Sequence, residues 1–156
     1  MNNILTLYYA KRTHHCNNKS NRGIVQQKTK YANIPKLTFK NLSQNTIQAG
    51  TDKSIYINIL FEDGDGNIGF GTNNLFLRDN RDTIWIPYNI PDIPDKFNPE
   101  SGLNGIIQID YEAAFLLLRT DTLHALTDTL TWDIYMKDKA GNTSNTITTT
   151  PLILTK

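Results

Sequence analysis

The sequence has a single cysteine, Cys16, so no disulfide can form within the chain. It also has no apolar run approaching the roughly 18 residues that a membrane-spanning helix needs. At 156 residues, the chain is nevertheless long enough to bury a hydrophobic core without a disulfide or metal staple. We therefore expect one globular domain with a tail.

Motifs that carry catalysis are missing as well. There is no Gly-x-Ser-x-Gly, Walker loop, His-Glu-x-x-His or dinucleotide fingerprint. His124 is the only histidine outside the N-terminal tail, and its apolar neighbours favour a partly buried structural residue. Acidic pairs such as Glu62 with Asp63 come without any indication of a cleft. The sequence therefore predicts a protein that is not an enzyme.

Acidic residues are absent from the first 50 positions, which hold eight Lys or Arg. The remainder holds eight basic residues against all 15 acids. This asymmetry predicts a basic, disordered leader or tether over residues 1–33 and a folded domain over residues 34–156. The basic residues are scattered and lack an interleaved aromatic pattern, so we expect no binding to nucleic acid.

Asn (18) and Thr (19) are abundant, and both suit turns and strand surfaces better than helix interiors. Residues 54–61 and 130–136 place apolar side chains at every second position, which is typical of strands with one buried face. Four of the six prolines fall within residues 87–99 and predict an excursion or a sheet edge. Residues 112–119 are expected to continue a strand or form a short turn. The fold class predicted from these patterns is an all-β antiparallel sandwich of about seven strands.

Polar chemistry is concentrated in the loop 61–71, which has four glycines and alternates Asp63, Asp65 and Asn67 along the chain. Ca²⁺ binds six to eight oxygen ligands, and these three side chains with Asp138 offer a calcium site. The alternative is that the Asp side chains cap the turn by accepting hydrogen bonds from backbone N–H groups. Both interpretations stay open from the sequence.

The spacing of those three side chains also matches the first ligands of an EF-hand loop. However, the sixth position is Ile68 rather than Gly, and the twelfth is Asn74 rather than Glu. An EF-hand is therefore excluded.

Aromatic residues gather in or near the proline-rich segment, where Trp85, Tyr88 and Phe97 are candidates for ligand binding. Exposed aromatic rings can stack on sugars or anchor a partner protein, but they can equally fill a core. Trp132, in contrast, lies on the apolar face of a regular strand pattern and is expected in the core.

Two motifs carry a family resemblance that covers residues 34–154. Phe-Glu-Asp-Gly-Asp-Gly-Asn-Ile-Gly, from Phe61, resembles a loop of small secreted lipoprotein domains from Gram-negative bacteria. Asp-Lys-Ala-Gly-Asn-Thr-Ser, from Asp138, resembles a turn near the end of bacterial immunoglobulin-like domains. The resemblance implies an immunoglobulin-like sandwich at the cell surface and no particular chemistry. In such a sandwich both loops lie at one end, so Asp63, Asp65 and Asn67 should approach Asp138 and Asn142.

The N-terminal leader, residues 1–33, contains a possible signal for cellular location. Cys16, followed by a polar segment, is similar to the lipidated cysteine of a bacterial lipoprotein, although His14 and His15 replace the small residues expected before it. The alternative is a solvated tether.

Together these features predict a non-catalytic cell-surface, outer-membrane or extracellular bacterial module for spacing or protein interaction. Calcium is its cofactor if the polar loop binds a metal, and no cofactor is expected if the Asp side chains only cap the turn; a lipid anchor would be its only membrane contact. The alternative function is a carbohydrate-binding module.

Overall fold

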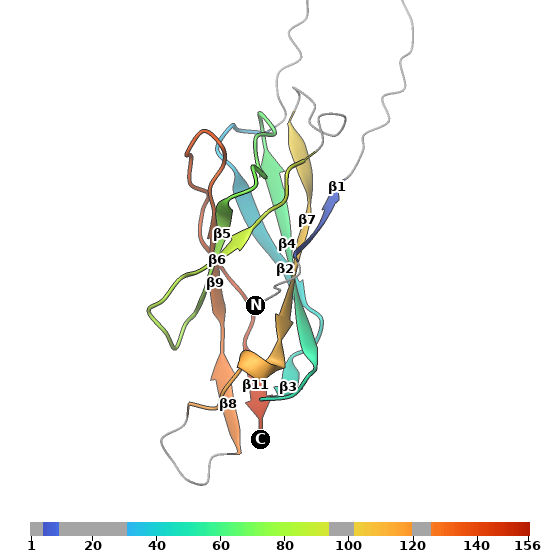
Figure 1. Cartoon of the computed structure of the whole chain (residues 1–156), viewed down its shortest axis with the longest axis vertical. Helices are drawn as coiled ribbons and strands as arrows, with labels where there is room; N and C mark the ends of the chain where they lie inside the picture. The colour runs from blue at the N-terminus through green and yellow to red at the C-terminus, as the bar shows by residue number, and fades with distance from the viewer. Residues whose placement is uncertain (1–4, 10–30, 94–101, 120–125) are drawn as a thin grey trace, which may run out of the picture.

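The computed structural model describes residues 5–9, 31–93, 102–119 and 126–156. Over these residues the chain is an all-β sandwich with one short 3₁₀ turn, η2 (Ala113–Phe115). Two sheets face each other along the long axis of the molecule, and a third, smaller sheet extends the end where the C-terminus lies (Figure 1). None of the described helical segments has the length and apolar character needed to cross a bilayer.

Each main sheet has four strands. The first sheet has the order β1-β7-β4-β2, with all neighbours antiparallel, and comprises β1 (Leu5–Tyr9), β7 (Leu103–Glu112), β4 (Ser54–Asp63) and β2 (Lys36–Leu42). The second has the order β10-β9-β5-β6, also antiparallel, and comprises β10 (Ile147–Thr148), β9 (Trp132–Met136), β5 (Asn73–Asp79) and β6 (Ile86–Asn89).

The third sheet has the order β3-β11-β8 and comprises β3 (Thr46–Gln48), β11 (Leu152–Thr155) and β8 (Thr127–Leu130). Its β11 pairs parallel with β3 and antiparallel with β8. Because β8 leads into β9 with only Thr131 between them, the chain passes here from the third sheet to the second.

The strand order of the main sheets is that of an immunoglobulin-type sandwich. Strands β2, β4 and β7 occupy the positions of strands A, B and E of that fold, and β5, β9 and β10 those of C, F and G. The chain therefore leaves β4 and β9 at the same end of the sandwich, which brings the two loops that follow these strands together.

The core lies between the two main sheets and follows the sequence periodicity. On β4, Ile55, Ile57, Ile59 and Phe61 are at most 1% exposed. On the facing sheet the side chains of Leu75, Leu77, Trp132, Ile134 and Met136 are fully buried. Burying one such side chain stabilises a fold by about 1.5–3 kcal/mol. The predicted all-β sandwich and the core position of Trp132 are thereby confirmed.

Residues 112–119 end β7 and form the short turn η2, which is the second of the two expectations for this segment. Two details differ from the sequence predictions. The described residues form eleven strands rather than about seven, because short strands such as β3, β8 and β10 fall below what periodicity can detect. The leader, expected to be disordered over residues 1–33, contributes β1, which pairs with β7 at the sheet edge.

Candidate metal centre

The loop after β4 is held by hydrogen bonds between its alternating polar residues. The backbone N–H of Asn67 donates to Asp63 Oδ2 at 2.9 Å, and the Asn67 amide Nδ2 donates to Asp65 Oδ2 at 2.9 Å. Gly66 between them has φ 67°, a conformation that glycine adopts without steric cost. The loop therefore folds back on itself and gathers three oxygen-bearing side chains.

Gly64 allows a close approach at the base of this loop. Its N–H donates to the carbonyl of Ala32 at 2.7 Å, and a Cβ at this position would lie 2.5 Å from the Tyr31 carbonyl oxygen. The segment that enters the domain thus lies directly against the loop.

The turn after β9 is built in the same way. Asn142 donates its backbone N–H to Asp138 Oδ1 and its amide Nδ2 to Asp138 Oδ2, both at 2.7 Å. The two loops are joined by the backbone, because Lys139 N–H donates to the Asn67 carbonyl at 3.0 Å. The predicted approach of the two motifs is confirmed.

Three carboxylates meet where the loops touch. One oxygen from each of Asp63, Asp65 and Asp138 lies within 4.8 Å of the others. Asp63 and Asp138 are buried at 0% and 2% exposure, whereas Asp65 is partly exposed. No ion pair within the described part of the chain involves any of the three. Like charges packed this closely without a counter-charge are unfavourable.

Three buried oxygens in this loop also have no hydrogen-bond partner among the residues that the structure describes. They are Asp63 Oδ1, Asp65 Oδ1 and Asn67 Oδ1. The Asn67 N–H that caps the turn donates to Asp63 Oδ2. Capping therefore explains the position of Oδ2 but not that of Oδ1. Capping and cation binding are therefore compatible, and the oxygens that capping leaves over are those a hard cation would bind.

The crowding of these carboxylates changes the pKa of Asp63. Burial, together with the neighbouring charge of Asp65, raises the pKa of this carboxyl to about 7. The charge of Asp138 acts in the same direction, and the hydrogen bond from Asn67 opposes it. The site thus disfavours its own negative charge unless a cation neutralises it.

Two of the three residues predicted for ligand binding, Tyr88 and Trp85, lie in the described part of the chain. Tyr88 is buried at 4% exposure. Trp85 is half-buried, with its ring edge-on to Tyr135 and the Arg78 guanidinium 4.7 Å from its centroid. Both rings are thus at least partly covered by other residues, and their role in ligand binding stays a prediction.

Several other predicted positions fall outside the described residues. They are Phe97, His124 and Cys16 with the neighbouring His14 and His15.

A cavity beside β6 and β7 was not predicted. It is lined by Tyr111, Phe115 and Arg119 among others, with Tyr88 as the only lining residue that the sequence had singled out. These residues come from separate segments and have no shared spacing, so no sequence signal could have assembled them.

Comparisons of the chain with protein-family models, with curated proteins and with solved structures gave no match. The fold and the site therefore define the class to which the chain can be assigned. It is an all-β sandwich with immunoglobulin-type strand order and an acidic cluster between two loops at one end.

Proposed function

We propose that this protein is a non-catalytic, calcium-stabilised sandwich module that acts in spacing or protein interaction at the cell surface or outside the cell. The ion would bind between the loop after β4 and the turn after β9. The observation that carries the proposal is the convergence of Asp63, Asp65 and Asp138 without a counter-charge, together with buried oxygens that have no hydrogen-bond partner in the described part of the chain.

The donor set favours calcium. The cluster offers carboxylate and amide oxygens and has neither histidine nor cysteine, which selects a hard cation over zinc or copper. Magnesium demands near-ideal octahedral geometry, whereas calcium accepts six to eight oxygens in an irregular arrangement. Asp63, Asp65, Asn67 and Asp138 would supply side-chain ligands, and backbone carbonyls or water would complete the shell.

A structural role follows from where the ligands sit. Asp63 ends a strand of one sheet and Asp138 follows a strand of the other, so a bound ion would tie the two sheets at this end. Two of the three carboxylates are buried, which suits an ion that braces the fold. The Ala32 carbonyl accepts a hydrogen bond from Gly64 in the same loop. A bound ion would therefore also stabilise the contact between this loop and the segment that contains Ala32.

Calorimetric and thermal titration with Ca²⁺ tests this proposal. We expect saturable binding and a rise in melting temperature, because a ligand at 100 times its Kd stabilises a fold by about 2.7 kcal/mol. Asp65→Asn should weaken the affinity by roughly tenfold or more, since ligand charge helps to set calcium affinity. Asp52→Asn, in an exposed turn outside the cluster, is the matched control and should bind as the native chain does.

The absence of both heat and stabilisation at millimolar calcium would refute the metal site. Equal calcium affinity in Asp65→Asn and the native chain would place the ion elsewhere.

A further inference from the structure

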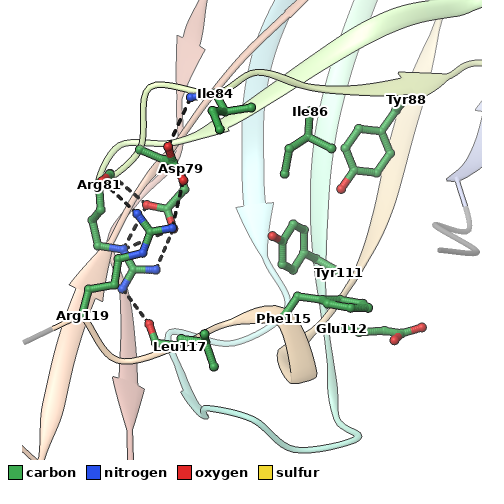
Figure 2. A pocket seen from close by; sticks show the side chains of 11 residues that line it. Asp79, Arg81, Ile84, Ile86, Tyr88, Tyr111, Glu112, Phe115, Leu117 and Arg119 are labelled. Atoms are coloured by element: carbon green, nitrogen blue, oxygen red, sulfur yellow. Dashed lines mark hydrogen bonds and ion pairs between the residues drawn. The ribbon is translucent and has the colours of Figure 1, made fainter.

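A cavity of about 330 Å³ opens between β6, the end of β7 and η2 (Figure 2). This volume lies at the lower end of the range for small-molecule sites, which is about 300–1,000 Å³. The cavity lies near the Ser54–Glu112 pair of the first sheet, whereas the acidic cluster lies at the opposite end of the same strands, near the Asp63–Leu103 pair. The two sites are therefore separate.

Two phenol groups face this cavity. Figure 2 shows the hydroxyls of Tyr88 and Tyr111 turned into the hollow beside Ile86. Neither hydroxyl has a hydrogen-bond partner among the described residues, although Tyr88 is only 4% exposed. Burial raises the pKa of both tyrosines, so each hydroxyl stays protonated and can both donate and accept a hydrogen bond.

The charged groups along one wall are already paired with one another. Arg81 forms ion pairs with Asp79 and Asp128. Arg119 pairs with Asp82 at 2.9 Å and donates to the Arg81 carbonyl at 2.9 Å. Because three carboxylates surround two guanidinium groups, this wall has no net positive charge with which to attract an anion.

Glu112 is the remaining charged residue of the lining. Figure 2 shows its carboxylate pointing away from the two tyrosine hydroxyls. It therefore does not supply a buried charge for a cationic ligand.

Exposed apolar side chains line the same cavity. Ile84 and Leu117 are 65% and 64% exposed, and Phe115 is 46% exposed. Apolar groups left in water beside unpartnered hydroxyls suit a ligand that has both a C–H face and hydroxyl groups.

We propose that this cavity binds a neutral saccharide, with the ring of Phe115 against the sugar's C–H face and the hydroxyls of Tyr88 and Tyr111 bonded to sugar hydroxyls. A neutral sugar ring presents both a C–H face and hydroxyl groups. It carries no charge, which matches a lining whose Arg and Asp side chains pair with one another. The site goes beyond the structural role proposed above and uses different residues from the calcium cluster.

The test begins with the full chain on an array of neutral and acidic oligosaccharides, in calcium and in chelator. The best neutral hit is then titrated calorimetrically against variants. We expect Tyr111→Phe, which keeps the ring that packs on Trp132, to weaken binding by about tenfold, the cost of about one hydrogen bond. Phe115→Ala should weaken it by a similar or larger factor.

Tyr56→Phe is the matched control, because Tyr56 is an exposed tyrosine of β4 outside the cavity, and it should bind unchanged. Asp65→Asn should also retain saccharide binding, which separates this proposal from the calcium site. Failure of every neutral glycan to bind would overturn the proposal, as would binding of acidic glycans alone. Unchanged binding in both Tyr111→Phe and Phe115→Ala would overturn it as well.

Discussion

The carboxylates of Asp63 and Asp138 lie within 4.8 Å of each other although Asp63 ends a strand of one sheet and Asp138 follows a strand of the other. Their loops are also joined by the hydrogen bond from Lys139 N–H to the Asn67 carbonyl. The backbone thus holds together two groups whose charges repel, and that repulsion makes this end of the domain responsive to a cation.

Asp63→Asn should stabilise the calcium-free protein. The substitution keeps the shape and an oxygen for the Asn67 N–H, but removes a buried charge that Asp65 and Asp138 oppose. At pH 8 in chelator, we expect a gain on the order of 2 kcal/mol in the free energy of unfolding. Urea denaturation measures this value.

The order should reverse in millimolar calcium, because the native chain gains the ion and the Asp63→Asn variant loses a ligand. A variant that is less stable than the native chain in chelator would contradict the account of the cluster given above.

Thr149→Val should destabilise the domain. Thr149 Oγ1 accepts the backbone N–H of Trp132 at 3.0 Å, and its own N–H donates to the Trp132 carbonyl at 2.9 Å. Valine keeps the volume but leaves the buried Trp132 N–H without an acceptor, which costs about 1–3 kcal/mol. Thermal denaturation compares it with Thr150→Val, at an exposed neighbour that should change little. Equal stability of the two variants would contradict the prediction.

Asn145→Ala should weaken the link between the sheets. The Asn145 side chain accepts the Leu37 N–H at 2.8 Å and donates to the Leu37 carbonyl at 2.9 Å, so it serves β2 as a substitute strand partner. Leu37 is only 1% exposed, so water cannot readily replace the two lost hydrogen bonds of its backbone. Their loss should cost about 1–3 kcal/mol in the free energy of unfolding.

Hydrogen exchange at Leu37 should also become faster in Asn145→Ala, whereas Thr146→Ala, at an exposed neighbour, should leave that exchange unchanged. Unaltered exchange in Asn145→Ala would mean that the side-chain pairing does not protect the strand.

Asp133→Asn should lower stability only above acid pH. The hydrogen bond from Arg78 lowers the pKa of Asp133, and that from Thr148 acts in the same direction. A lowered folded-state pKa stabilises the fold above the unfolded value of about 3.9 and ceases to do so as pH falls through the folded value. The pair is partly exposed, so the cost at pH 7 should not exceed about 1 kcal/mol.

Denaturation curves of the native chain and Asp133→Asn should therefore converge near pH 2. A constant difference across that range would contradict the assignment of the effect to this carboxylate.

The long strands could be predicted because their signal is local. In β4 and in residues 130–136, every second side chain is apolar, and the structure buries those side chains. The loop chemistry after Phe61 was equally visible, since glycine and Asp or Asn alternate there. Shorter elements gave no such signal. Strand β10 has two residues, and hydrogen bonds with Ser144 and Thr149 extend its pairing with β9.

The amino-acid sequence by itself determined the fold class, the apolar faces of the strands and the composition of both polar loops, because each depends on neighbours a few positions away. The tertiary structure alone decided that Asn145 completes a strand edge and that Tyr88, Tyr111 and Phe115 line one cavity. These contacts join residues from separate strands and turns, and only the packing of the two sheets brings them within reach.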